Sequence, residues 1–516
     1  MNRLYGPNES WIRAAGFARD FEGGSWPQPV SEFQISRWET AASKAPYQAI
    51  CRYEEMLGLQ PGLLVAAADN AYRSASGVAG VQFLERRVDP GRAETHRLAD
   101  ELLERATTGD LMSGHDWDRL TSSLVAFSHT FVPHSVWTSV AQRLLSEQLI
   151  ARGVAWYQRY ESFNRLLAHD GAQRAAVAAC AAVAADPTYQ MRVEPLSVLD
   201  ACEHPEAARL VLSEITNPSS PAAAFGALIA SARKIQLGHF DRPQLRQLQA
   251  ALVELIHDPV LRTPVHALAV ELLCRLPDGR RGGPSGQLRH LLEADATLQQ
   301  VLTVGRLAAP DTGQVVVERV VNRAVAGLLR HVVGFSDDVL PQIVDDALHS
   351  PDPDIRYAAS QHIGASPYRG PVADAIAAEL NNRHALTDPD RAPAMLWLLG
   401  ATSRESDRII PERLLLTHGL PKALTAAAAR AVGHFVGTSD DEFWRRAMTA
   451  HRSAWRSTRS PLHENVLRSL VYAFGIVRNE AMLLSTARDP DLPPSAREAA
   501  TWWMDRPAVI HNSARQ

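Results

Sequence analysis

Four side chains between positions 32 and 37 could make chemical contact with another molecule. They supply a carboxylate, an aromatic ring, a hydroxyl and a guanidinium, and they are Glu32, Phe33, Ser36 and Arg37. Ile35 and Trp38 are spaced to fall together on one face of a helix, which leaves these four to project elsewhere. This arrangement is typical of a recognition helix, which packs by one side and reads a partner with the other.

The flanking residues extend the pattern. Ser31 suits the position just before the helix, because its side chain can cap free backbone N–H groups. After a short polar break, Pro46 is expected to start an amphipathic helix that ends at Gly58. The stretch SEFQISRWETAASKAPYQAICRYEEMLGL resembles the third and fourth helices of the Cro/XRE-type helix-turn-helix family, whose members bind operator DNA. The resemblance covers residues 10–72.

The resemblance implies which residues meet double-stranded DNA. By position along the motif, the base-reading residues correspond to Glu32, Phe33, Ser36 and Arg37. Arg37 could donate two hydrogen bonds to a guanine edge, Phe33 could meet a thymine methyl, and Glu32 could accept from cytosine. Three further residues are expected nearer to phosphates: Ser31, Gln34 and Lys44. Repressors with this motif usually read two half-sites, so a homodimer is the default expectation.

Two features of this region depart from the family pattern. The preceding helix is expected over residues 11–21, and residues 22–30 then replace the usual turn of three or four residues. Residues 1–75 also contain seven basic and eight acidic groups, a balance of −1, whereas phosphate neutralisation supplies much of the affinity for DNA. DNA binding by the module alone therefore stays open. The alternative is a degenerate module that serves as a dimerisation or capping element.

From about residue 90 the chain is predicted to be all-α. Apolar residues recur at steps of three and four, as in Leu245–Leu248–Leu252–Leu255, and no sustained alternation indicates strands. Four Asp-Pro pairs are expected to open helices: Asp258-Pro259, Asp352-Pro353, Asp388-Pro389 and Asp489-Pro490. Four glycines after apolar runs are expected to end helices in a left-handed conformation: Gly364, Gly400, Gly433 and Gly475.

These glycines are 33 to 42 residues apart, which is the length of a two-helix repeat. The clearest unit, Asp352-Pro353-Asp354-Ile355-Arg356-Tyr357-Ala358-Ala359 running to Ile363-Gly364, resembles the HEAT repeat. The expected organisation is a helix-turn-helix module over 1–75, a helical connector with the first array helices over 76–165, and HEAT-like repeats over 166–516. The fold expected is thus a small helix-turn-helix module followed by an α-solenoid.

Composition limits the functional classes. The formal net charge of −4 gives no global attraction to nucleic acid or to an anionic membrane, so any DNA contact must come from a local patch. Only three of the 53 basic residues are lysine, a bias typical of a high-GC bacterial genome. No signal peptide, membrane-spanning run, metal-binding spacing or enzyme motif is recognisable, and the four cysteines are far apart. We therefore expect a cytoplasmic protein that is not an enzyme and needs no cofactor.

Three hypotheses follow for the function. The favoured one is a transcriptional regulator whose module reads an operator and whose helical array senses a ligand, peptide or protein on a concave surface around residues 150–440. The alternative is a protein-interaction scaffold with a vestigial helix-turn-helix module. The third is a HEAT-like DNA glycosylase, which would need a basic concave surface holding an aromatic side chain and a carboxylate together. The operator, the effector and the sign of regulation are beyond what the sequence specifies.

Overall fold

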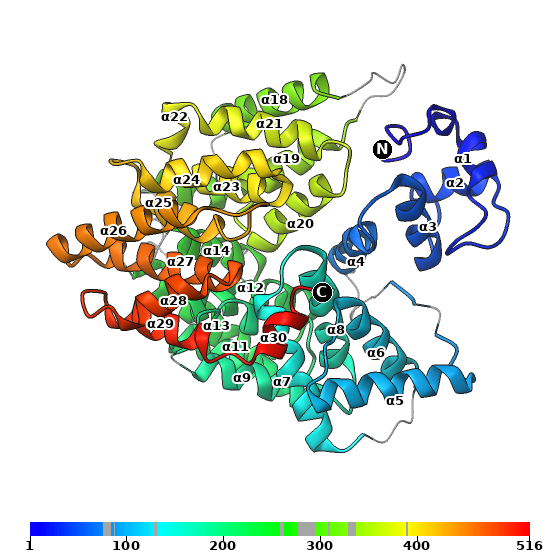
Figure 1. The fold of residues 1–516 in the computed structure, drawn as a ribbon, viewed down its shortest axis with the longest axis horizontal. Helices are drawn as coiled ribbons and strands as arrows, with labels where there is room; N and C mark the ends of the chain where they lie inside the picture. Colours follow the sequence, from blue (N-terminus) through cyan, green and yellow to red (C-terminus); the bar gives the residue numbers. More distant parts are fainter. Residues whose placement is uncertain are drawn as a thin grey trace.

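The computed structural model describes residues 1–75, 84–86, 88–127, 132–186, 188–258, 263–276, 295–307, 310–328, 337–388 and 391–516. Within these ranges the regular structure is helical, and the β-type pairing is a single isolated bridge between Gly23 and Trp26. The predicted all-α fold class is confirmed. Figure 1 shows a small N-terminal module beside a larger array of packed helices.

The N-terminal module has a hydrophobic core of its own. Its elements are η1 (Glu9–Ile12), α1 (Ala14–Asp20), α2 (Glu32–Glu39), α3 (Tyr47–Leu57) and α4 (Leu63–Ala75). Phe17, Phe21 and Ile35 are fully buried at its centre. Two predicted helix boundaries are confirmed. The Ser31 side chain accepts from the backbone N–H of Gln34, and Gly58 ends α3 in a left-handed conformation with φ of 63°.

The single helix expected over residues 11–21 is wrong. The 3-10 helix η1 ends at Ile12, Arg13 is extended with ψ of 132°, and α1 begins only at Ala14. The cause lies outside the segment. Arg3 donates to the carbonyl oxygens of Trp11 and Ile12 at 2.5 and 2.6 Å, and so engages carbonyls that a continuous helix would use for its own ladder.

The first half of the array follows the module. Its helices are α5 (Ala93–Thr108), α6 (Gly114–Ala126), α7 (His134–Ile150), α8 (Gly153–Ala168), α9 (Gln173–Ala185), α10 (Glu194–Ser197), α11 (Pro205–Thr216), α12 (Pro221–Leu237), α13 (Arg242–His257) and α14 (Thr263–Arg275). In this part α11 packs on α12 and α13, and α12 packs on α14. Each helix therefore buries its apolar stripe mainly against near neighbours in the chain.

The second half continues the same way. Its helices are α17 (Ala296–Val304), α18 (Pro310–Ala326), α19 (Leu340–His349), α20 (Pro353–Gly364), α21 (Arg369–Leu380), α22 (Arg383–Leu386), α23 (Arg391–Thr402), η2 (Glu405–Arg408), α24 (Ile409–Leu416), α25 (Lys422–Ala431), α26 (Asp441–Thr458), α27 (Pro461–Val477), α28 (Glu480–Arg488), α29 (Pro494–Met504) and α30 (Ala508–Ser513). Here α21, α23, α25, α27 and α29 form a continuous row of packed helices.

The repeating glycines have a different role from the predicted one. None of the four has a positive φ, and Gly400 and Gly475 lie inside α23 and α27 rather than at their ends. Instead, each closely approaches a neighbouring segment. An added Cβ would lie 3.3 Å from Ala401 O at Gly364, 3.3 Å from the Phe435 ring at Gly400 and 3.0 Å from Ala473 Cα at Gly433, and at Gly475 it would overlap the Trp503 ring. Their spacing therefore reflects close packing between layers, not helix capping.

The prediction that Asp-Pro pairs open helices is confirmed at Asp352-Pro353. The Asp352 side chain accepts from Asp354 N–H, and Pro353 is the first residue of α20. At Asp489 it is wrong, because the carboxylate accepts from Asp491 N–H in a turn and α29 begins only at Pro494. The Asp388 side chain accepts from Arg391 N–H at the start of α23. Pro259, Arg262 and Pro389 lie outside the described residues.

The two ends of the array meet. Helix α30 packs on α7, and Figure 1 shows the C-terminus beside α8. The guanidinium of the fully buried Arg159 donates both to Met112 O, before α6, and to Ser513 O, in α30. Apolar residues from Leu102 to Val301 and from Leu415 to Ala514 consequently share one hydrophobic core, while a second core extends from Val316 to Phe435.

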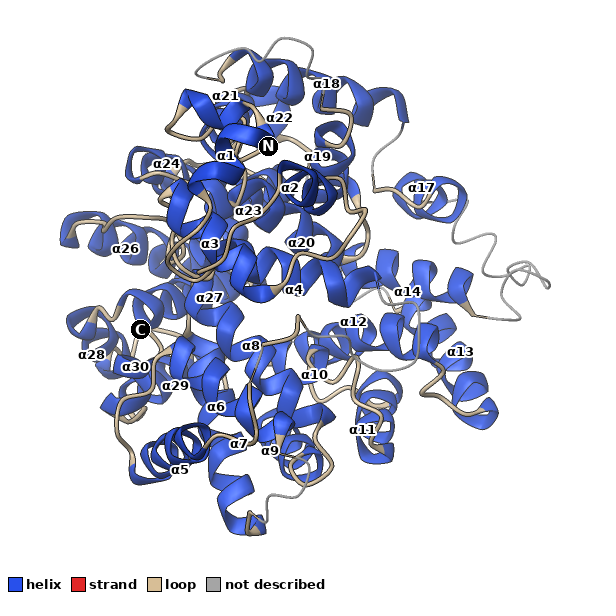
Figure 2. Cartoon of the chain, turned by 90° about the vertical axis from the view of Figure 1, so that its right-hand side faces the viewer, coloured by secondary structure: helices blue, strands red, loops and turns tan. Residues whose placement is uncertain are grey.

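Helix α4 docks the N-terminal module on the array, between α8 and α20, as Figure 2 shows from the side. Arg73 of α4 is 5% exposed and forms an ion pair with Glu161 of α8, which is 2% exposed. The Arg73 guanidinium carbon also lies 4.4 Å from the centre of the Tyr160 ring. His362 of α20 contacts the backbone oxygen of Ala67 at 3.3 Å.

A second group of charges crosses the same junction. Arg86 binds Asp69 of α4 at 2.6 Å and Asp118 of α6 at 3.1 Å, and Arg165 of α8 also binds Asp118, at 2.8 Å. Burial alone would raise the pKa of Asp118, but the two guanidinium groups bring it below its ordinary value. The module is therefore joined to the array by buried, mutually satisfied charges.

We predict that Gly475→Ala destabilises the protein, because the new methyl group meets the Trp503 ring. Overpacking of this kind costs about 1–3 kcal/mol. The measurement is the free energy of unfolding in urea, followed by circular dichroism. The control is Gly370→Ala in α21, where an added Cβ has no neighbour within 4 Å. An equal loss in both variants would contradict a packing role for Gly475.

We predict that Arg73→Ala leaves Glu161 as an unpaired buried charge and lowers stability by about 3–5 kcal/mol. Arg19→Ala is the control, because the Arg19 ion pair with Asp20 is on the surface and its side chain is 72% exposed. That pair should contribute about 1 kcal/mol or less. Thermal unfolding of both variants beside the unmodified protein provides the comparison. Equal midpoints for the two variants would show that the junction charges do not hold the module.

Candidate functional site

Helix α2 presents the four predicted base-reading residues on its outer side. Glu32, Phe33, Ser36 and Arg37 are all exposed, and Phe33 is 68% exposed. The Arg37 guanidinium carbon lies 5.7 Å from the centre of the Phe33 ring, one helical turn away. Ile35, by contrast, is fully buried in the core of the module. The predicted division of this helix into a buried side and a projecting side is confirmed.

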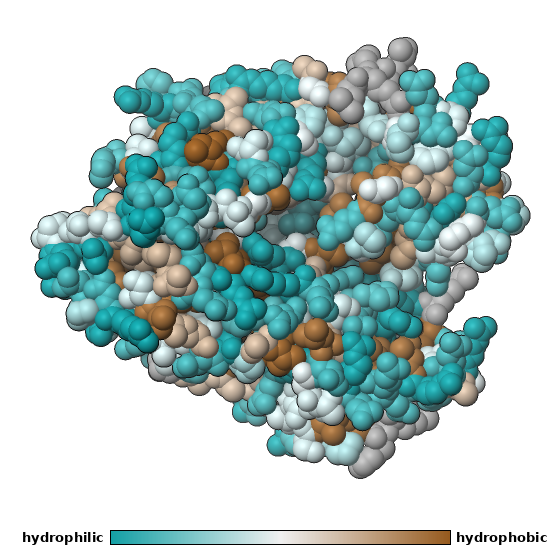
Figure 3. Space-filling view, in the orientation of Figure 1, coloured by the Kyte–Doolittle hydropathy of each residue, from teal (hydrophilic) through white to brown (hydrophobic). Residues whose placement is uncertain are grey.

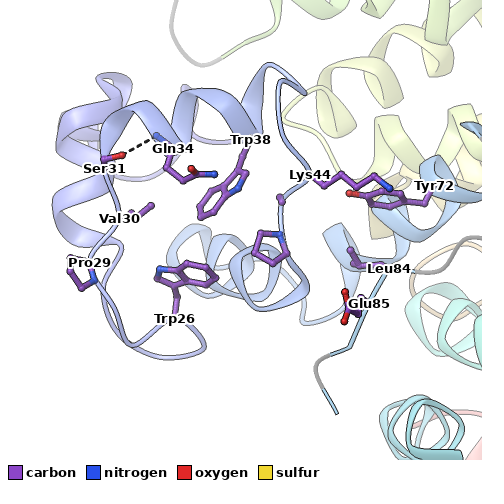
Figure 4. A pocket seen from close by; sticks show the side chains of 12 residues that line it. Trp26, Pro29, Val30, Ser31, Gln34, Trp38, Lys44, Tyr72, Leu84 and Glu85 are labelled. Atoms are coloured by element: carbon purple, nitrogen blue, oxygen red, sulfur yellow. Dashed lines mark hydrogen bonds between the residues drawn. The ribbon is translucent and has the colours of Figure 1, made fainter. Parts of the chain in front are cut away.

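The three residues expected near phosphates do not share the outer side of α2 with these four. Ser31, Gln34 and Lys44 line an open pocket of about 730 Å³ behind α2, which Figure 4 shows from close by. Along the helix, Ser31, Gln34 and Trp38 follow one another at steps of three and four, so they share one face. The seven predicted residues therefore separate into an outward group on α2 and a pocket group, which takes Ser31 and Gln34 from the start of α2 and Lys44 from the segment after it.

Aromatic rings form much of the pocket wall. Trp26 and Trp38 meet edge to face, with ring centres 5.4 Å apart and planes at 83°. Phe21 supports both, at 6.2 Å from Trp26 and 5.9 Å from Trp38. Tyr72 of α4 contributes a third ring from the other side of the pocket. This wall suits a flat apolar group, because aromatic rings stack or pack edge to face.

The expanded turn over residues 22–30 builds this wall. The bridge between Gly23 and Trp26 closes it into a compact loop, with N···O distances of 2.7 and 2.9 Å. Arg52 of α3 holds the start of the loop by donating to Phe21 O at 2.8 Å, and Glu55 accepts from Ser25 N–H at 3.1 Å. A segment that departs from the helix-turn-helix pattern is therefore an ordered part of the candidate site.

The polar groups of the pocket are few. The Lys44 ammonium lies 5.1 Å from the centre of the Tyr72 ring, and among the described residues no carboxylate is within ion-pair distance of it. Gln34 reaches Ser43 only weakly, with Nε2 and Oγ 3.4 Å apart. Glu85 supplies one carboxylate to the lining. The lining therefore combines aromatic and aliphatic side chains with four polar ones, and its exposed surface is mixed rather than predominantly apolar.

Sequence reasoning did not single out Trp26, Tyr72 and Leu84 as site residues. Trp26 lies in the expanded turn, and the other two come from α4 and from the segment after it. The one local feature that could have indicated a site was a tryptophan next to a proline in the expanded turn. The contributions of Tyr72 and Leu84 depend on how α4 folds back on α3, which no local pattern reports.

A second cavity, of about 450 Å³, lies where α3 and α4 face α6 and α8. Its wall includes the buried carboxylate of Glu54, which accepts from the backbone N–H groups of Gly62, Leu64 and Val65. Burial raises the pKa of Glu54 in spite of these bonds. Asp69, Asp118 and Glu161 of the same wall are paired with arginines. These groups hold the junction together and offer little free capacity to a ligand.

The described residues contain no cluster of histidine, cysteine and acidic side chains that could hold a metal ion. Cys51, Cys180, Cys202 and Cys274 are all free thiols, two of them buried. In the part of the chain that the structure describes, no helix has both the length and the apolar character needed to cross a membrane. Comparison with protein-family models, with curated proteins and with solved structures finds no match to this chain.

Proposed function

We propose that the chain is a DNA-binding transcriptional regulator. The N-terminal module would read an operator through the outer side of α2, and the helical array would sense a ligand or protein partner. The observation that carries this proposal is the exposure of Glu32, Phe33, Ser36 and Arg37 on a helix whose other side is fixed in a core. Side chains held on a rigid helix can meet base edges in a reproducible geometry.

The docking of the module favours this proposal. Helix α4 contacts the array, whereas α1 and α2 lie on the side of the module away from α8 (Figure 1). The outer side of α2 is therefore not covered by the described part of the array. A duplex approaching α2 would meet the module before it met the larger part of the molecule.

The charges of the module limit how DNA would be bound. Four of its seven basic residues already form ion pairs within the protein: Arg3 with Glu39, Arg19 with Asp20, Arg52 with Glu55, and Arg73 with Glu161 of α8. No ion pair is found within the described ranges for Arg13, Arg37 or Lys44. With so few cations left for phosphates in each module, a plot of log affinity against log salt concentration should have a slope no steeper than about −3. Specific contacts, or two modules in a homodimer, must then supply much of the affinity.

A second candidate is the interaction scaffold. It is favoured by the buried ion pairs of α4, which are what a capping element for the array would require. The two candidates differ in what the outer side of α2 does. A scaffold binds no nucleic acid, so substitutions on the outer side of α2 would have no effect on nucleic-acid binding.

We predict that Arg37→Ala lowers specific DNA affinity by about 1–3 kcal/mol and relaxes preference at one base position, because an arginine bidentate to guanine is lost. The full-length chain would first select sequences from a genomic fragment library. The selected site would then be titrated with each variant at one fixed salt concentration.

Arg19→Ala, on α1, is the matched control, because it also removes one exposed guanidinium from the module. The thermal unfolding midpoints of all three proteins should agree. Unchanged affinity for Arg37→Ala would remove this residue from the reading face. If the full-length chain selects no sequence at all, the scaffold becomes the better account.

A further inference from the structure

The two sides of α2 face different kinds of space. Its outer side is open to solvent, and its inner side forms part of a pocket of about 730 Å³. We propose that this pocket binds a small aromatic molecule carrying a single negative charge, and that the bound molecule changes how α2 meets DNA. The second half of this proposal rests on the proposed function, whereas the first half does not.

The size and walls of the pocket define the apolar part of the ligand. Pockets for small molecules and cofactors usually measure about 300–1,000 Å³. Trp26, Trp38 and Tyr72 provide aromatic rings, and Pro46 and Leu84 add aliphatic surface to the lining. Flat aromatic groups gain more from such walls than flexible chains do, because they lose little conformational freedom on binding.

The polar lining defines the charged part. Lys44 is the one cationic side chain of the lining, and it has no carboxylate partner among the described residues. Its ammonium at the face of Tyr72 is placed to receive an anion that approaches along the aromatic wall. Glu85 lines the same pocket and would repel a doubly charged group. A monoanion such as a carboxylate or sulfonate therefore fits better than a phosphate dianion.

The same pocket connects α2 to the array. Leu84 and Glu85 directly precede Arg86, which is tied to Asp69 of α4 and Asp118 of α6. The backbone N–H of Leu84 also donates to Asp69 at 3.2 Å. A ligand in the pocket would thus contact α2 on one side and a segment fixed to the array on the other. Because Ser31, Gln34 and Trp38 move with Arg37, filling the pocket alters the position of the reading side.

The binding test uses the full chain and two fluorescent probes of similar shape. 1-Anilinonaphthalene-8-sulfonate carries one negative charge, and N-phenyl-1-naphthylamine carries none. We expect Lys44→Gln to weaken sulfonate binding about tenfold, the equivalent of one lost charged contact, and to leave the neutral probe unchanged. Lys422→Gln is the control, because Lys422 is an exposed lysine on α25, outside the pocket.

A second variant addresses the apolar wall. Ala45 also lines the pocket. Ala45→Phe places a ring in the pocket and should weaken binding of both probes, while the helical circular dichroism stays unchanged. Sulfonate affinity that is the same in Lys44→Gln and the unmodified protein, or reduced equally by Lys422→Gln, would overturn the assignment of the pocket. Should Ala45→Phe fail to fold, the two lysine variants still decide the question.

The coupling test adds the selected DNA site to the same proteins. A saturating concentration of the sulfonate probe should change DNA affinity by about 5–150-fold, the range of typical allosteric coupling. In Lys44→Gln, the probe concentration needed for this change should rise in proportion to the weaker probe binding. If the probe binds and DNA affinity stays unchanged, the proposed coupling is wrong, but the assignment of the pocket stands. Probe binding by a chain that selects no DNA would overturn the proposed function and the coupling together.

Discussion

The position of α2 depends on the contacts that hold the module to the array, which include the buried ion pairs around α4 and the hydrogen bond from Asn2 to Ala365 O. Arg73 with Glu161, and Arg86 with Asp69 and Asp118, connect the module to the first helices of the array. Charges removed from water are stable only when their partners are held in good geometry, so these pairs tolerate little sliding or rotation. A flexible linker would have left the module free to rotate, whereas the ion pairs of this junction restrict its rotation.

Local features of the chain were predictable from sequence, because their causes lie within a few residues. The division of α2 into a buried and a projecting side follows from helical spacing, and the Ser31 cap and the left-handed Gly58 follow from the chemistry of helix ends. Features with distant causes were not predictable. Arg3 breaks the helix expected before residue 21, and Trp503 gives Gly475 its role from the next layer.

The candidate site shows the same contrast. Its outward group was found from spacing alone, because all four members lie on one helix. The pocket group joins residues from the expanded turn, α2, α4 and the segment at Leu84, and only the folded chain brings these together. Ser31, Gln34 and Lys44 were singled out by their place in a motif, which does not show which way a side chain points. Figure 3 likewise shows a hollow in the middle of one face of the molecule that no pattern in the sequence indicates.

The size of the helical array beside the small N-terminal module has a mechanical consequence. Because α30 packs on α7 and Arg159 joins both ends, the array is closed at its seam and offers a stiff base to the module. Breaking one buried pair at the junction costs about 3–5 kcal/mol, whereas allosteric coupling typically amounts to about 1–3 kcal/mol. A coupling of this size is smaller than the cost of breaking a junction pair, so the coupling that we propose would leave the junction intact. In the coupling that we propose, the effect of such a ligand would appear at α2, which lines the pocket and carries the exposed side chains.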